Sequence, residues 1–172
     1  MSAAVHRAPW CVGLVIATAL SSAILLAVTW MLIRVVPAGI PWPAFRTLLQ
    51  ALPLAILLIS VLFIVRGYEL TYDALHVRRL LWSTVIPLAG LTRAWADPKA
   101  LRAVRLFGNG GLFSISGLFW NRSLGRFRVF ANDPRRAVVL DLAGRRVVVT
   151  PEHPDAFLDD LRRFYPQLAR ST

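Results

Sequence analysis

Residues 58–79 read LISVLFIVRGYELTYDALHVRR, and the pattern of apolar side chains changes at Gly67. Up to Val65 almost every residue is apolar, which is typical of a helix in a membrane or a core. From Tyr68 to Tyr72 apolar and polar side chains alternate, which is typical of a β-strand with one buried face. We therefore expect the chain to change from helical to mainly β structure at this point.

Two long apolar runs lie before this change. They cover residues 11–33 and 47–65, roughly 23 and 19 residues, close to the ~20 that a helix needs to cross the hydrocarbon core of a bilayer. No Asp or Glu occurs in residues 1–66. We therefore assign residues 1–66 to a membrane anchor with two transmembrane helices, and residues 67–172 to a separate domain.

The link between the two runs, residues 34–46, contains three prolines and one glycine, so it interrupts the helix and predicts a helical hairpin. Basic residues near the ends of membrane helices favour the cytoplasmic side. Four of them flank the terminal side and two lie in the link: Arg7, Arg66, Arg78 and Arg79 against Arg34 and Arg46. This bias predicts a multi-pass protein with both termini in the cytoplasm.

Catalytic and metal-binding patterns are weak in this chain. Its single cysteine, Cys11, excludes an intramolecular disulfide and a cysteine-based metal site. His76 and His153 have no carboxylate at helical ligand spacing, and no pair of carboxylates stands out. We therefore expect no metal, no cofactor and no enzymatic activity.

A glycine cluster, Gly108-Asn109-Gly110-Gly111, lacks the G-x-x-x-x-G-K pattern of a phosphate-binding loop and is interpreted as a flexible loop. An enzyme that uses this loop is kept as the second alternative for function. The residues after it include a candidate apolar loop, Leu112, Phe113, Phe119 and Trp120. These side chains either fill the core of the domain or form a loop that enters lipid or contacts a partner.

Short strands are predicted along the rest of the domain. Besides the hairpin that begins at Tyr68, they cover residues 84–88, 101–107, 127–131, 137–142 and 145–150. After Pro151 an amphipathic helix is expected, with Phe157 and Leu161 on its apolar face. The predicted domain therefore has about seven strands closed by one C-terminal helix.

The stretch from Tyr68 to Val77, followed by Ile86-Pro87-Leu88, resembles the start of bacterial pleckstrin-homology-like (bacterial PH) domains that follow membrane helices in small proteins. Further segments resemble the same family: residues 107–113, 117–119, 132–134 and 148–151. The resemblance implies a mainly-β PH-like domain, a bent sandwich or partly open barrel with a C-terminal helix, and no catalysis. It also implies location in a bacterial inner (plasma) membrane.

Sixteen of the twenty basic residues lie after residue 66, together with all nine acidic ones. The candidate contacts with headgroups or a partner are Arg66, Arg78, Arg79, Arg122, Arg126 and Arg128. We expect a non-enzymatic integral membrane protein that presents its PH-like domain for protein–protein interaction or assembly, with an unknown protein partner or a second copy of itself. The alternative is a module that binds anionic headgroups of membrane lipids. No nucleic-acid recognition motif is present, so specific nucleic-acid binding is not expected.

Overall fold

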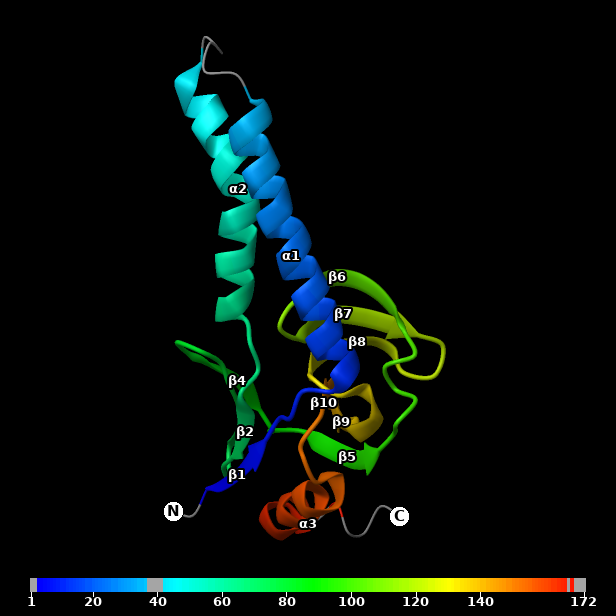
Figure 1. The fold of residues 1–172 in the computed structure, drawn as a ribbon. Helices are drawn as coiled ribbons and strands as arrows, with labels where there is room; N and C mark the ends of the chain where they lie inside the picture. The colour runs from blue at the N-terminus through cyan, green and yellow to red at the C-terminus, as the bar shows by residue number, and fades with distance from the viewer. Residues whose placement is uncertain (1–2, 37–41, 167, 169–172) are drawn as a thin grey trace.

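The computed structural model describes residues 3–36, 42–166 and 168. Two long helices project from a domain made mainly of β-strands, and a short helix closes the far end of the domain (Figure 1). The long helices are α1 (Val12–Val35) and α2 (Pro43–Leu62), which lie side by side. The two apolar runs thus form the expected hairpin.

The ends of the helices differ from the predicted runs for reasons that lie in the backbone. α2 already begins at Pro43, because proline at the first helical position removes no hydrogen bond that the helix needs. It ends at Leu62, and Val65, which the sequence assigns to the membrane run, is buried in the domain core. The other predicted helix breakers of the link, Pro37, Gly39 and Pro41, lie outside the described residues.

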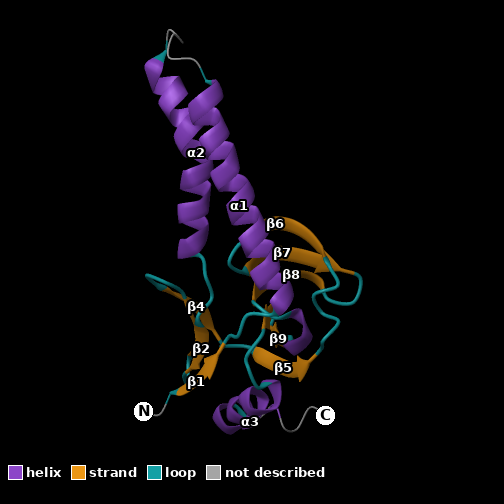
Figure 2. Ribbon diagram, in the orientation of Figure 1, coloured by secondary structure: helices purple, strands orange, loops and turns teal. Residues whose placement is uncertain are grey.

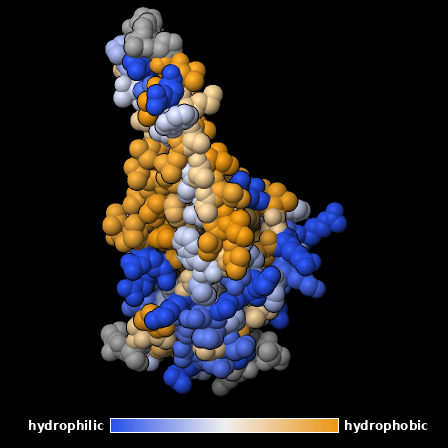
Figure 3. Space-filling view, viewed as in Figure 1, coloured by the Kyte–Doolittle hydropathy of each residue, from blue (hydrophilic) through white to orange (hydrophobic). Residues whose placement is uncertain are grey.

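Both α1 and α2 are long and apolar enough to cross a membrane. In the most apolar part of each helix only 11% and 6% of the residues are buried within the protein. A core helix of a soluble protein would be mostly buried, so this exposure distinguishes the pair from core helices. On the face seen in Figure 3, the surface of the helices is mostly hydrophobic and gives way to hydrophilic surface on the domain.

The first sheet has four antiparallel strands in the order β1-β2-β3-β4. Their bounds are β1 (Ala4–Arg7), β2 (Gly67–Leu70), β3 (Ala74–Arg78) and β4 (Ser83–Pro87). β1 precedes α1, yet it pairs along its whole length with β2, from Ala4 opposite Leu70 to Arg7 opposite Gly67. β1 is short and lies directly before the first apolar run, which is why the sequence assigns it to the anchor rather than to a sheet.

The second sheet has six strands in the order β5-β9-β10-β8-β7-β6, and only the β8–β10 pair is parallel. The strands are β5 (Leu91–Ala96), β6 (Val104–Gly110), β7 (Ile115–Asn121), β8 (Gly125–Ala131), β9 (Val138–Leu142) and β10 (Arg145–Val149). A 3-10 turn, η1 (Pro134–Arg136), joins β8 to β9, and α3 (Pro154–Phe164) follows β10 (Figure 2). The expected mainly-β domain with a C-terminal helix is confirmed.

Three of the ten strands in the described residues, β1, β5 and β7, were not predicted. In β5 a register shift between Leu91 and Arg93 interrupts the alternation of buried and exposed positions. The prediction of a flexible glycine loop is wrong, because Gly108 to Gly110 form the end of β6 and pair with β7. A side chain on Gly108 would place its Cβ atom 2.4 Å from the carbonyl oxygen of Ser116. Glycine is therefore needed here for close approach of two strands.

The main core lies between the two sheets and under α3. Buried side chains from the first sheet, such as Tyr68 and Leu75, pack with Leu140 of β9 and with Phe157 and Leu161 of α3. A second apolar cluster covers the other face of the six-stranded sheet and includes Phe119, Phe127, Val129, Val139 and Val148. The two sheets thus form the two layers of the expected PH-like sandwich.

Hydrogen bonds fix both long helices to the domain. The Asn132 side chain donates from Nδ2 to the carbonyl oxygen of Ala8 before α1, at 2.8 Å, and to that of Val65 after α2, at 2.7 Å. Thr18, inside α1, donates from Oγ1 to the carbonyl oxygen of Gly111 at 3.2 Å. These hydrogen bonds therefore hold the domain close to the start of α1 and the end of α2.

Candidate functional site

Four arginines surround a cavity of about 220 Å³, the arginine cavity, at the end of the first sheet that adjoins the helices. They come from β1, from the segment before β2, and from the end of β3, and the lining consists of Val5, His6, Arg7, Arg66, Gly67, Arg78 and Arg79. No carboxylate of the described residues lines it. The structure therefore brings together three residues that the sequence predicts as headgroup or partner contacts, Arg66, Arg78 and Arg79.

Strand pairing explains why Arg7 joins this group. Arg7, Gly67 and Arg78 are direct partners across β1, β2 and β3, and directly paired residues point to the same face of a sheet. Gly67 carries no side chain between the two arginines, and a Cβ atom there would lie 2.7 Å from the carbonyl oxygen of His6. Glycine is therefore needed at position 67 for the close approach of β1, and the row carries one arginine on each side of it.

The charges around this cavity are mostly uncompensated. Arg7, Arg66 and Arg78 are exposed, and within the described part of the chain none of their side chains has a hydrogen-bond or ion-pair partner. Glu69 is the acidic residue in the next row of the sheet, opposite His76, and it makes no ion pair with any residue that the structure describes. Three free guanidinium groups at one cavity create a positive potential that attracts anions.

Arg79 differs from its neighbours because it is buried, with 8% of its surface exposed. It donates from Nε to Thr84 Oγ1 at 2.9 Å and from Nη1 to the carbonyl oxygen of Phe63 at 2.6 Å. Its guanidinium also lies over the rings of Phe63 and Phe130. Burial lowers the pKa of Arg79 from its ordinary value, but a guanidinium is basic enough to stay charged at neutral pH. Its main contacts are therefore inside the protein.

A second, larger cleft of about 510 Å³ lies on the other side of Arg79. Its walls are the last turns of α2, the β3–β4 hairpin and strands β6 to β8. The lining residues are Ile59, Ser60, Phe63, Arg79, Thr84, Phe107, Gly108, Asn109, Ser116, Gly117, Leu118, Arg128 and Phe130. None of them is a His, Cys, Asp or Glu, so this cleft contains no side chain for general acid–base catalysis by those groups.

The remaining predicted arginines separate into two places. β8 alternates buried Phe127 with exposed Arg126 and Arg128, and only Arg128 lines the larger cleft. Arg122 is exposed in the turn between β7 and β8, and like Arg126 it lines neither cavity. These two therefore lie apart from the arginines of the smaller cavity.

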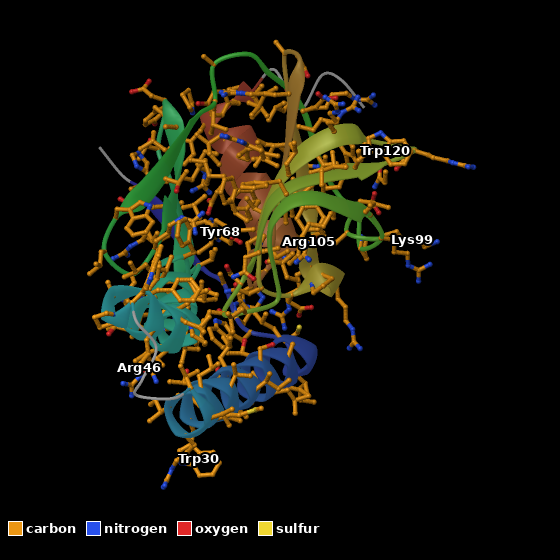
Figure 4. All side chains as sticks on the ribbon, turned by 90° about the horizontal axis from the view of Figure 1, so that it is seen from above. Trp30, Arg46, Tyr68, Lys99, Arg105 and Trp120 are labelled. Carbon is orange, nitrogen blue, oxygen red and sulfur yellow. The ribbon has the colours of Figure 1, made fainter. Side chains whose placement is uncertain are left out.

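The four residues of the predicted apolar loop also separate. Leu112 and Phe113 lie in the β6–β7 turn, where the Phe113 ring packs against Trp10 and its backbone N–H donates to Thr18 Oγ1. Phe119 is buried in β7 and stacks on Phe127 in the core. Trp120 is exposed at the edge of the domain away from the helices, as Figure 4 shows. The four do not form one continuous loop.

Comparison with known proteins agrees with this architecture. Residues 66–164 match the family model described as Bacterial PH domain, more than half of the chain. The chain belongs to the bacterial PH domain family. No curated protein and no solved structure matches it. PH domains are generally non-catalytic and generally mediate lipid or protein interactions.

The match also locates what this chain adds to the bacterial PH domain. It begins at residue 66, so β1, α1 and α2 lie outside the matched range. Arg7 therefore reaches the arginine cavity from outside the matched domain, whereas Arg66 and Arg78 lie within it. In sequence, Arg7 shows only as a charge before an apolar run, and only the pairing of β1 with β2 identifies it as part of a site.

Proposed function

We propose that this protein is a non-enzymatic, multi-pass protein of the bacterial inner membrane, with both termini in the cytoplasm, whose PH domain binds anionic phospholipid headgroups. The observation that carries the proposal is the arginine cavity. Arg7, Arg66 and Arg78 have free guanidinium groups around one hollow, next to the end of a helix that is apolar enough to span the bilayer. Guanidinium groups bind phosphate oxygens with paired, charge-assisted hydrogen bonds.

The proposed position at the membrane is supported by the helices. Their apolar side chains are mostly exposed, and lipid is the surrounding that such a surface requires. Arg66 follows α2 by four residues, and its N–H donates to the carbonyl oxygen of Arg78 at 2.8 Å. The cavity would then lie at the depth of the headgroups, where each basic residue adds to the attraction of an anionic surface.

A non-enzymatic role is supported by the chemistry of the described residues. Within them no three His, Cys, Asp or Glu side chains gather as a metal site would require. As far as the chain is described, neither cavity is lined by a carboxylate, and the larger one also lacks histidine. The glycine cluster that an enzyme could have used is part of β6 and its turn, and Asn109 bonds to the backbone there.

A second candidate function is binding of a protein segment, or of a second copy, at a free sheet edge. Among the described residues, β5 has a sheet neighbour on one side only. A hollow of about 250 Å³ lies beside it and is lined by residues of β5 and α3, among them Ala94, Trp95 and Leu158, and by Leu168. An extended peptide could add to this edge as a further strand. This surface lies at the end of the domain away from the long helices (Figure 1).

The proposal is tested by the lipids that the full-length protein retains. The protein is purified from membranes in mild detergent, and bound lipids are identified by mass spectrometry. The variant Arg7→Gln, Arg66→Gln, Arg78→Gln should lose anionic phospholipid roughly tenfold, because each arginine near the surface contributes to the attraction. The control Arg102→Gln, Arg122→Gln, Arg126→Gln makes the same change in charge at exposed positions outside both cavities. Equal retention by the two variants would contradict headgroup binding at the cavity.

A further inference from the structure

The larger cleft is open to the side of α2. One of its walls is formed by Ile59, which lies one turn before the end of α2 and is 55% exposed, and by Phe63, which caps the helix. The surface of a candidate membrane span therefore continues directly into the cleft. A molecule could pass from the lipid around α2 into the cleft without crossing water.

The interior of the cleft suits an apolar occupant. Phe130 and Leu118 line it. Apart from Arg128, its polar side chains have partners within the protein: for example, Arg79 donates to Thr84 and Phe63, and Ser116 Oγ lies 3.2 Å from Ser114 Oγ. Because these groups are satisfied, they do not require a polar ligand.

Two side chains of the cleft lining remain available for a ligand. Phe107 of β6 is 80% exposed, which is a large aromatic surface to leave in water. Arg128 of β8 is exposed and, among the described residues, its side chain has no hydrogen-bond or ion-pair partner. Phe107, Leu118 and Arg128 are direct partners across β6, β7 and β8. This row therefore has an exposed aromatic ring at one end and a free cation at the other, which match the two ends of an anionic lipid.

We propose that this cleft holds an acyl chain of an anionic membrane lipid, with the anionic group of that lipid at Arg128. The volume of about 510 Å³ falls within the ~300–1,000 Å³ range of small-molecule sites. This inference rests on the proposed insertion of α1 and α2 in the bilayer, but it does not depend on headgroup binding at the arginine cavity. The same chemistry fits a glycerophospholipid and a free fatty acid, which the experiment separates.

The test uses the full-length protein in nanodiscs that contain phosphatidylglycerol with a photoreactive diazirine on its acyl chain. After irradiation, the labelled peptides are mapped by mass spectrometry. We expect adducts on exposed positions of the helices, such as Ile24 and Leu52, and also on the cleft residues Leu118 and Phe130. Labelled helices without labelled cleft residues would overturn the cleft proposal while leaving membrane insertion intact. No adducts on either would overturn both.

A tryptophan in the cleft tests the same proposal by blocking it. Leu118→Trp should fill the cleft and reduce labelling of Phe130 at least fivefold, whereas Leu106→Trp makes the same change on β6 at an exposed position outside the cleft lining and should not. Unchanged labelling of Phe130 in a folded Leu118→Trp variant would contradict the proposal. If that variant does not fold, the wild-type map decides alone.

Arg128→Gln should reduce labelling by phosphatidylglycerol more than labelling by phosphatidylcholine with the same chain. Equal effects would remove Arg128 from the site. A diazirine fatty acid in the same nanodiscs identifies the source. Stronger cleft labelling by the free acid would assign the cleft to fatty acids, and stronger labelling by phosphatidylglycerol would assign it to phospholipids. Either result supports an acyl-chain site, and absence of cleft labelling by both would overturn it.

Discussion

The Nη1 atom of Arg79 donates a 2.6 Å hydrogen bond to the carbonyl oxygen of Phe63, the residue that caps the C-terminal end of α2. This contact joins the PH domain to the end of a candidate membrane span. The carbonyl groups at the end of a helix lack partners within the helix, and the helix dipole favours a cation there. Arg79 supplies both the donor and the charge.

Arg79→Lys should therefore destabilise the protein even though it keeps the charge. Lysine cannot bond Thr84 and the Phe63 carbonyl in the same planar arrangement. Loss of a hydrogen bond made by a charged group costs about 1.5–3 kcal/mol. Chemical unfolding of the full-length protein in detergent micelles measures the change. The exposed neighbour provides the control: Arg78→Lys should stay within about 0.5 kcal/mol of the wild type, and equal effects would contradict this role.

Asn132→Ala should release the N-terminal strand. The side chain donates to the carbonyl groups of Ala8 and Val65, which lie before the start of α1 and after the end of α2. Each buried polar group left without a partner costs about 1–3 kcal/mol. We expect a lower free energy of unfolding and faster tryptic cleavage after Arg7, which lies in β1. Unchanged cleavage at Arg7 would show that Asn132 does not hold β1 in place.

Tyr68→Phe removes a buried hydroxyl with two backbone partners. The hydroxyl donates to the carbonyl oxygen of Phe130 at 2.5 Å and accepts from the N–H of Thr150 at 3.1 Å. The variant should lose about 1–3 kcal/mol at neutral pH. Thermal unfolding of both proteins in the same detergent checks this expectation, and an unchanged Tm would contradict it.

Tyr68 should also make stability depend on alkaline pH. Burial raises its pKa to about 12 from the ordinary value of 10.0. The unfolded chain thus releases the Tyr68 proton above pH ~10 while the folded protein keeps it, so the folded state should lose stability as pH rises from ~10 to ~12. The slope of Tm against pH in this window should be smaller for Tyr68→Phe. Identical slopes would indicate that Tyr68 ionises equally in both states.

His6 should make stability depend on mildly acidic pH. Burial lowers its pKa, and this effect exceeds the opposing attraction of Asp160, whose Oδ2 lies 3.3 Å from His6 Nε2; His153 lowers it further. The unfolded chain then takes up a proton more readily, so stability should be fully present above the ordinary pKa of 6.5 and fall as the pH drops below it. Tm measured from pH 7.5 to 5 should fall less steeply for His6→Gln. A steeper fall in the variant would contradict the assignment.

Local sequence patterns predicted much of the fold. The alternation from Tyr68 to Val77 correctly indicated β2 and β3, and Ala143-Gly144 correctly marked the turn between β9 and β10. Features that depend on contacts between strands were missed. The glycines at positions 108 and 117 are paired across β6 and β7, and their role in close strand approach is visible only once the partner strand is known.

The candidate site could be predicted only in part, because local sequence shows which residues lie near a helix end but not which strands pair. Arg66, Arg78 and Arg79 are close in sequence to the end of the second apolar run, so their position near the helix end was predictable. Arg7 joins them only through the pairing of β1 with β2 across about sixty residues of intervening chain. The burial of Arg79 depends on α2, β4 and Phe130 of β8 together, and no local pattern indicates it.

Hydrogen–deuterium exchange of the full-length protein tests the central claim most directly. The protein is compared in nanodiscs of phosphatidylcholine alone and with added phosphatidylglycerol. Headgroup binding at the arginine cavity predicts that the anionic lipid slows exchange in β1, at the start of β2 and at the end of β3, and leaves β5 and the turn at Arg122 unchanged. Equal exchange in both nanodiscs throughout the first sheet would contradict the claim that this cavity binds anionic headgroups.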